Sequence, residues 1–544
     1  MYKKWIALAL ALCLCLSLAA CAQTPASSVA SAPSSTAESK TDTSSTVEEA
    51  TYPIVKDKIT ISGVVFGSQT TNTRITWDEM EKLTNIKVDW KIVPTDQKTV
   101  FIAAGDWPDL FHGGFDSALI EEWGVNGKKI VNYEDYADIM PNLQQTYKDY
   151  ENYFAKKRMM ASDGGIYYLL KIDNGPTSSV VRMHYNASLL EEYDLKVPTT
   201  VDEFHDVLVV LKEKLGGAPY ADNVAATIWG SNGDYYFFSA FGPATSPDFY
   251  ADANGKVVYG RISDQYRLTM QYLNQLYAEG LLHQEYLTLD NSTKASMIND
   301  RKLAFGADGW SSAEERAFNG DFEKLQVLAP LTSKYDSERK IYAGNVIAPI
   351  GTEVNAESKY VKEICQMLDV LFATEEVAKG TGMYGIAGTF GPENVTWEWA
   401  NADHTEYNFI IPDDYDASVN GVYQSARIIF SNLGRYDTFK NAVLASASNN
   451  RSRQLGYIKN TKPYEEEVPF VYGTMNEEET DVINNYMTEM KEYVKEWNAA
   501  FITGTKNPND DAVWSEYCAG FDKLHLTEVT AAYQSAYTRF STLD

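Results

Sequence analysis

The reactive residue types of this chain do not form any of the common catalytic patterns. Its six histidines are scattered, and none stands in a His-Glu-x-x-His pattern, which would hold zinc on one face of a helix. The sequence has no Gly-x-Ser-x-Gly nucleophile elbow and no P-loop. His112 and His184 are isolated, and we interpret them as structural. No local motif therefore nominates a catalytic site.

Two further patterns fail because of the residues around them. A Gly-x-Gly-x-x-Gly pattern occupies residues 380–385, but a dinucleotide site needs a strand before it, and a helix is predicted there instead. We interpret the glycines as the end of that helix. Residues 252–255 hint at an EF-hand loop, yet its first and last ligand positions would be Tyr250 and Arg261. We therefore assign no metal and no cofactor, and a calcium site of another kind stays open.

Cys21 is the residue with the clearest predicted chemistry. Lys3 and Lys4 precede an apolar run over residues 5–16, which is too short for a membrane span and is typical of an export signal. Leu-Ala-Ala-Cys at 18–21 then puts small residues before a cleavage site and a thiol at the new N-terminus. This resembles the lipobox of bacterial lipoproteins. We expect residues 1–20 to be a signal peptide and Cys21 to carry a lipid.

The composition describes an acidic protein on a tether. Residues 21–51 are rich in Ser, Thr and Ala, which predicts a flexible segment because nothing there offsets the entropy of ordering. The formal net charge is −28, and it becomes two units more negative without Lys3 and Lys4. Such a chain has no electrostatic footprint for nucleic acid or for an anionic membrane surface. We therefore expect no nucleic-acid partner and no membrane contact except the lipid.

Only two cysteines lie beyond residue 21, namely Cys365 and Cys518. Two cysteines make neither a disulfide framework nor a four-cysteine zinc site. Cys365 belongs to an apolar stripe of helical spacing over residues 361–368, which predicts a buried free thiol. A single bridge between the two stays open as the alternative.

Hydrophobic patterning predicts that the body begins near Tyr52 with β-α-β-α-β order. Alternation predicts strands over 59–66, over 86–92 with a stop at Pro94, and from Asp109, separated by helices that end at Asn85 and near Ala104. This order implies a parallel sheet covered by helices. Ligands bind such sheets at the carboxyl ends of the strands, which selects the loops 67–73 and 111–115.

Several later elements carry clear end signals. Thr200-x-x-Glu203 and Thr474-x-x-Glu477 match capping boxes, and Gly504 is predicted to end the long helix that follows the second box. An apolar stripe over 266–277 predicts another helix, closed by Gly280. Short strands are predicted at 303–305 and 327–328.

Several segments together resemble family 1 extracellular solute-binding proteins of carbohydrate ABC importers, and most of all their large lipoprotein branch with oligosaccharide ligands. They share short motifs that recur in the same order along the chain and span roughly residues 57–540: 104–110 (AGDWPDL), 185–204, 255–260, 276–282, 501–504 and 533–539. The chain departs from the family pattern at Ala387, where an acidic residue is usual, and at His525.

The resemblance implies a two-lobe α/β fold of the periplasmic-binding-protein type (type II), in which crossing strands join the lobes around a ligand cleft. It implies lobe 1 over 52–176 plus about 342–420, and lobe 2 over 177–341 plus part of 421–544, with the C-terminal helices shared. It also implies a monomer without cofactor or catalysis, whose partners are an oligosaccharide and the permease subunits of an ABC importer. Lobe closure would link ligand energy to one conformation.

Aromatic rings and carboxylates are the expected ligand contacts, because rings stack on sugar faces and carboxylates accept hydrogen bonds from hydroxyls. The candidates are Trp310 and Asp308, which follow the strand predicted at 303–305, Trp229 in a polar turn, Tyr384 in a glycine-rich turn, and the pair Trp397 and Trp399. The Trp pair shares one face if the segment is extended, and sheet core is its alternative reading. Asp106 is a weaker candidate, since an aspartate there also suits a turn.

Two other functions stay open on the sequence alone. A surface glycoside hydrolase needs only two carboxylates about 5–10 Å apart, and the chain holds 75 acidic residues, but no motif selects such a pair. A peptide- or other-solute-binding lipoprotein is the second alternative.

Overall fold

The computed structural model describes most of the chain beyond residue 50, within one compact unit that spans Val47–Asp544. The described residues are 51–67, 75–172, 183–222, 233–307, 324–343, 347–374, 393–395, 397–411, 434–435, 442–445, 449–467 and 475–542. Trp229, Asp308, Trp310, Tyr384 and Cys21 lie outside them.

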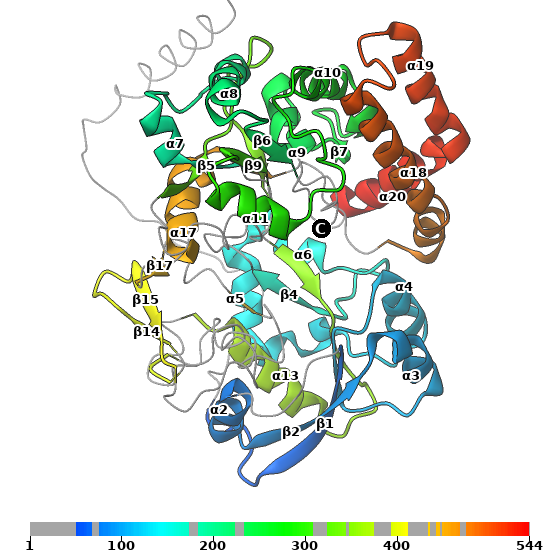
Figure 1. Ribbon diagram of the computed structural model, residues 1–544. Coiled ribbons are helices and arrows are strands. Elements are labelled where there is room, and N and C mark those ends of the chain that lie inside the picture. Colours follow the sequence, from blue (N-terminus) through cyan, green and yellow to red (C-terminus); the bar gives the residue numbers. More distant parts are fainter. Residues whose placement is uncertain are drawn as a thin grey trace, which may run out of the picture. The chain divides into compact units, whose positions relative to one another are not determined.

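The first sheet has the predicted β-α-β-α-β order. Its strands β1 (Ile59–Phe66), β2 (Ile86–Val93) and β3 (Leu110–His112) are parallel, with α2 (Ile75–Thr84) and α3 (Lys98–Ala104) between them in the chain (Figure 1). A fourth strand, β13 (Thr352–Val354), joins β3 antiparallel from more than 200 residues away and is the one strand of this sheet that local patterning did not predict. Asn85 ends α2 with a φ of 59°, as expected for a residue that tolerates the left-handed region.

A second sheet has the order β10-β5-β9-β6. Its strands are β5 (Met183–Asn186), β6 (Tyr220–Asp222), β9 (Phe305–Ala307) and β10 (Leu325–Leu328). The strand predicted at 303–305 therefore lies two residues later. Leu303 and Ala304 are buried like strand residues, but the amides of Ala304 and Phe305 both donate to Pro219 O before the ladder starts.

Two hydrophobic cores are each assembled from two stretches of chain. The first core takes residues from Ile61 to Ile172 and from Ile347 to Phe372, and the second takes residues from Met183 to Ile341 and from Met490 to Val529. The chain therefore changes core between Ile172 and Met183, and again between Ile341 and Ile347. The strands at these changes, β4 (Leu169–Ile172) and β12 (Ile347–Ile350), pair antiparallel with Ile172 opposite Ile347.

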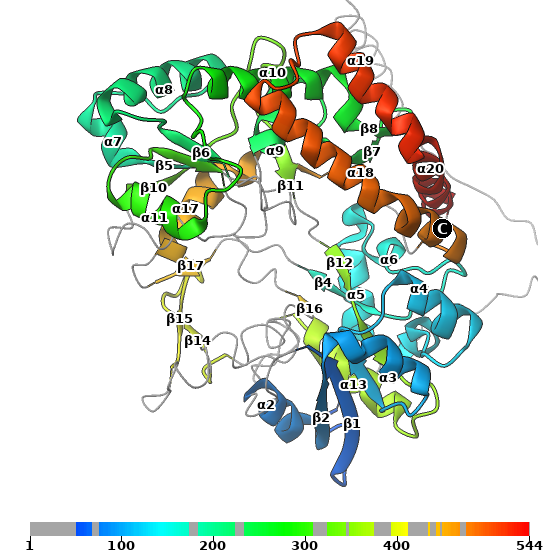
Figure 2. The ribbon, with the colours of Figure 1, turned by 45° about the vertical axis from the view of Figure 1, so that its right-hand side comes forward.

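The C-terminal helices complete the second core. In α18 (Glu477–Thr503) the side chains of Met490, Val494, Trp497 and Phe501 form one buried stripe at spacings of three and four. Helix α18 packs against α10 (Asp264–Ala278) on one side and α20 (Leu526–Thr542) on the other (Figure 2). Gly504 ends α18 in the left-handed conformation, as predicted.

The two predicted capping boxes differ from the observed ones. At α18 the box is formed by Asn476 and Glu479. The side chain of each residue accepts a hydrogen bond from the backbone N–H of the other, at 2.9–3.0 Å. The prediction of Thr474 and Glu477 was wrong, because two overlapping patterns of the same kind stand two residues apart and the sequence does not rank them. At α8 (Val201–Leu215), Thr200 is the cap as predicted, but Glu203 accepts from Thr199 instead of Thr200.

The two cysteines beyond residue 21 are free thiols, so the alternative of a bridge is excluded. Cys365 is buried in α13 (Val361–Asp369), as predicted, and Cys518 is half-buried. Burial raises the pKa of the Cys518 thiol to about 11, which makes it a poor nucleophile. Among the described residues, no helix combines the length and the hydropathy that a membrane crossing requires.

A buried carboxylate joins two helices of the first core. Asp369, the last residue of α13, accepts from the amides of Asn142 and Leu143 and from the Asn142 side chain at 2.8–3.2 Å. It thereby caps α5 (Pro141–Asp149), whose own N-cap residue, Met140, makes no side-chain bond. Burial raises the pKa of Asp369 from 3.8 to about 7 in spite of these hydrogen bonds.

This pKa predicts a specific pH dependence of stability. The folded state binds the proton of Asp369 more tightly than the unfolded chain does. Protonated Asp369 therefore adds to the free energy of unfolding, fully below about pH 4, and this stabilisation is lost as the pH rises to about 7. The full effect corresponds to about 4 kcal/mol, and about 3 kcal/mol of it falls between pH 5 and pH 8. We expect the free energy of unfolding of the wild type, relative to Asp369→Asn, to fall by that amount between these pH values in urea titrations. A difference that stays constant with pH would contradict it.

Candidate functional site

The carboxyl ends of β1 and β3 meet at one edge of the first sheet. Their register pairs Val65 with His112, and β13 begins at the same edge because Thr352 pairs with His112. The Gly113 amide donates to Gly351 O, which ties the loop after β3 to the residue before β13. The loop 113–115 therefore lies where ligands of α/β sheets bind.

Close packing at this edge requires glycine. Gly113 has a φ of 75°, and a Cβ on Gly114 would lie 2.5 Å from Cε2 of Phe66. Phe66 stacks on Phe111 with ring centroids 6.2 Å apart, and Phe115 meets Phe111 edge to face at 5.2 Å. The aromatic cluster gives the loop a rigid base.

The histidine at this edge is neutral and structural. His112 Nδ1 lies 3.1 Å from Thr352 Oγ1, and the Tyr133 hydroxyl donates to Thr352 O at 2.9 Å. Burial lowers the pKa of His112 to about 3, so the imidazole carries no charge at neutral pH. These contacts hold β13 against β3.

The second sheet also has an edge where several segments begin. Strands β6 and β9 are parallel, and their last residues, Asp222 and Ala307, are paired. Met183, the first residue of β5, pairs with the same Ala307. The segment with Trp229 begins directly after Asp222, and the segment with Asp308 and Trp310 begins directly after Ala307. Both segments that carry a predicted aromatic contact are therefore joined in the chain to one sheet edge.

A buried ion network holds the helix that follows the Trp229 segment. Arg261 donates to Asp234 and Tyr266 OH, at 3.0 and 2.7 Å, and to Asp248 at 2.8 Å. Asp234 belongs to α9 (Gly233–Phe238), and the side chains of Arg261 and Asp234 are 10% and 7% exposed. Tyr266 OH continues the network to Asn498 of α18 at 2.8 Å. The start of α9 is therefore fixed to the second core, a link that no local motif revealed.

The Trp pair lies in a strand with both rings in contact. Trp397 and Trp399 flank β14 (Trp397–Trp399), with centroids 5.2 Å apart in an edge-to-face arrangement. Trp397 is fully buried, and Trp399 is half-buried and stacks on His404 at 4.5 Å. Trp397 is thus a core residue in this structure, and Trp399 is the more accessible of the two. Asp106 is exposed in the turn after α3, following Gly105 with its φ of 75°.

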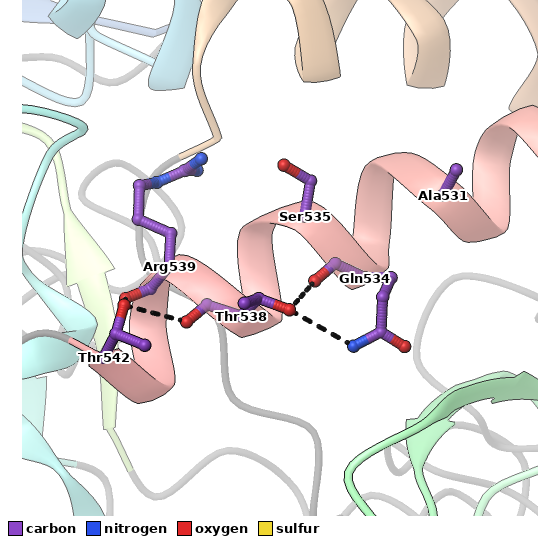
Figure 3. Close-up of a pocket in the computed structure, with 6 residues that line it drawn as sticks. All are labelled: Ala531, Gln534, Ser535, Thr538, Arg539 and Thr542. Atoms are coloured by element: carbon purple, nitrogen blue, oxygen red, sulfur yellow. Dashed lines mark hydrogen bonds between the residues drawn. The ribbon is translucent and has the colours of Figure 1, made fainter.

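A pocket of about 640 Å³ lies along one face of α20 (Figure 3). Two of its side chains are held by other elements. Arg539 binds both carboxylate oxygens of Glu479 at 2.6–2.7 Å, and Gln534 bonds Gly255 O and the Val257 amide. Sequence reasoning missed this pocket, although its residues recur at spacings of three and four: Ala531, Gln534, Ser535, Thr538, Arg539 and Thr542.

The sequence pattern of a known protein family matches this chain over most of the residues described above. The sequence pattern of the bacterial extracellular solute-binding proteins matches residues 68–378. This chain belongs to that family. Its relatives include the fructooligosaccharide ABC transporter substrate-binding protein FusA of Streptococcus pneumoniae, which is 25% identical over 91% of this chain and 93% of FusA.

Solved structures of family proteins share the fold. A HMO-binding, ABC-transporter-associated solute-binding protein of Bifidobacterium longum infantis superposes with a TM-score of 0.67 at 17% identity, covering 89% of this chain and 100% of that protein. FusA of S. pneumoniae in complex with kestose gives a TM-score of 0.64 at 20% identity, covering 89% and 99%. The predicted two-lobe fold of this solute-binding protein is thereby confirmed. Within the described residues, no group of three or more His, Cys, Asp and Glu is arranged to hold a metal ion.

The network around Arg261 gives a prediction about the stability of this solute-binding protein. Asp234→Ala leaves the buried guanidinium without one of its two carboxylates, and we expect a loss of about 3–5 kcal/mol in the free energy of unfolding. Asp511→Ala is the matched control, because Asp511 also bonds an arginine, Arg267 at 2.7 Å, but its side chain is 92% exposed. The control should cost less than about 1 kcal/mol in the same urea titration. Equal losses in the two variants would contradict the buried role.

Proposed function

We propose that this protein is the substrate-binding component of an ABC importer and captures an oligosaccharide outside the cell. Family membership supports a solute-binding role, and the similarity to FusA over nine-tenths of the chain supports an oligosaccharide as the solute. The finer features of the proposal rest on the sequence. They are a lipid at Cys21, residues 21–51 as a tether to the outer face of the cytoplasmic membrane, a monomeric state, and permease subunits that recognise the closed form.

Within this proposal, the ligand is held by the two sheet edges. The loops after β1 and β3 contribute from the first sheet, and the segments after β6 and β9, with Trp229, Asp308 and Trp310, contribute from the second. Tyr384 and Trp399 are further proposed contacts. The burial of Trp397 favours its reading as sheet core, which demotes it among the proposed contacts.

A thermal-shift screen of the purified full chain tests the function. Kestose, acidic oligosaccharides and peptides are each added, and a ligand that binds only the folded state raises the midpoint by mass action. At 100 times Kd the gain is roughly 2.7 kcal/mol. We expect a rise with one saccharide, which is recovered intact. A rise with peptides alone would overturn the proposal, and cleavage of the saccharide would instead indicate a hydrolase.

Substitution of the predicted aromatic contacts tests the place of binding. Trp310→Ala and Trp229→Ala should each raise the Kd for the saccharide identified in the screen by roughly tenfold, as expected for a central aromatic contact. Tyr335→Ala is the control, since Tyr335 is an aromatic residue that is 51% exposed and is absent from the proposed contacts. Isothermal titration measures the three affinities. An unchanged Kd in both Trp variants would place the saccharide elsewhere.

A further inference from the structure

The last turn of α20 contacts an element of the first core, although α20 itself packs on the second. The ring of Phe540 meets that of Phe154 edge to face, with centroids 5.7 Å apart. Phe540 is buried, and Phe154 directly precedes α6 (Ala155–Arg158), a short helix whose first residue belongs to the first core. The end of α20 lies beside α6 in both ribbon views (Figures 1 and 2). Side chains thus join the two cores at this place.

A buried cation reinforces this contact between the cores. Arg539, the residue before Phe540, binds Glu479 in the first turn of α18. Hydrogen bonds to Glu479 raise the pKa of the Arg539 guanidinium, and the charge of Glu121 acts in the same direction, against the effect of burial. Glu121 lies in a helical turn of the first core, where the amide and hydroxyl of Ser162 donate to its carboxylate. One guanidinium therefore attracts carboxylates from both cores.

The backbone of Phe154 indicates that its ring is retained for a contact outside its own segment. Its φ of 55° and ψ of 37° lie in the left-handed region, which is unfavourable for a bulky residue and suits glycine. The side chain is 47% exposed, so burial in the first core offsets this strain only in part. Such strain persists where the surrounding structure imposes it. The ring contact with Phe540 supplies a reason for a phenylalanine at this position.

Helix α6 also contacts the strand at which the chain returns to the first core. It packs on β12, and Arg158, its last residue, donates to Ile347 O at 3.2 Å. Ile347 is the first residue of β12 and pairs with Ile172 of β4, in the ladder where both changes of core occur. The lobes of a two-lobe protein rotate about the strands that join them. A contact next to those strands moves little in such a rotation, so it can persist while the lobes close.

We propose that the contact between Phe154 and Phe540, with Arg539 beside it, is a pivot that keeps the two lobes aligned, and that Phe154 is a positioning residue for saccharide binding. Its effect on affinity rests on the proposed function, whereas the alignment is a property of the free protein. Without the ring, the free protein adopts more arrangements of the lobes, and only a fraction of them can close on a ligand. The apparent Kd rises by the inverse of that fraction.

Distances between two spin labels in the free protein test the alignment. Lys87 in β2 and Lys214 in α8 are exposed, and their elements pack in the first and the second core. Both are replaced in the full chain by a ketone-bearing amino acid that takes the label, which leaves the cysteines unmodified. We expect Phe154→Ala to broaden the distance distribution by about twofold, because more lobe arrangements are populated. Double electron–electron resonance measures the distribution.

Tyr335→Ala is the matched control. Tyr335 is 51% exposed, and its ring meets the buried Phe241 at 6.2 Å, so the pair resembles that of Phe154 and Phe540 but involves the second core alone. The two alanine variants should lose similar amounts of stability, yet the control should keep the wild-type distribution. Phe154→Gly is the second test variant, because glycine tolerates the left-handed backbone and lacks the ring. It should broaden the distribution as Phe154→Ala does.

Isothermal titration with the saccharide identified in the screen measures the effect on binding. Both Phe154 variants should raise the Kd about fivefold, as expected when about one-fifth of the free molecules can close. Tyr335→Ala should leave the Kd unchanged. A Kd that is unchanged or lower in both Phe154 variants would overturn the positioning role.

The distance measurements separate failure of the pivot from failure of the proposed function. A wild-type distribution in both Phe154 variants overturns the pivot, and so does equal broadening in Tyr335→Ala. If the wild type binds no saccharide, the proposed function falls, and the distances alone decide the pivot. If Phe154→Ala does not fold, Phe154→Gly decides.

Discussion

The pairing of β4 with β12 is the constraint on which the rest of the structure depends. These strands are where the chain leaves the first core and where it returns, and their register places Ile172 opposite Ile347. Because both changes of core occur at one ladder, the first core must be assembled from two distant stretches. The return stretch supplies β13, which brings Thr352 to the edge of the first sheet.

Both sheet edges follow from this arrangement by the same physical rule. Neighbouring parallel strands have their carboxyl ends at the same edge of a sheet. The loops that follow the strands therefore gather at that edge, where ligands bind. In the first sheet, glycines keep that edge open against the aromatic cluster around Phe66 and Phe111. In the second sheet, the Arg261 network holds the first residues of α9 after the Trp229 segment. Rigid supports under short loops are what a specific binding surface requires.

Local patterns predicted most helices and strands. They failed where contacts with a segment far away in the sequence determine the local structure. The strands at 59–66 and 86–92 and the helix ends at Asn85 and Gly504 were predicted because alternation and end signals act within a few residues. The capping box at Thr474 was wrong because an equivalent pattern overlaps it, and Asn476 is the cap. The strand β13 was missed altogether, because it pairs with β3, which lies more than 200 residues away in the sequence. The aromatic contacts of the candidate site remain a prediction from chemical type, and the buried ion network of Arg261 and Asp234 was not predicted, because no local motif signals it.

The split composition of the cores has a consequence for a chain that emerges N-terminus first. Every first-core residue that the structure describes has emerged once Phe372 has, so most of that core can form while later parts of the chain are still emerging. The second core waits for Met490 to Val529, and the ion pair between Glu479 and Arg539 waits for the last turn of α20. During that interval the apolar faces from Met183 to Ile341 have no α18 to cover them. The apolar surface of the second core is therefore prone to aggregation until the chain is complete.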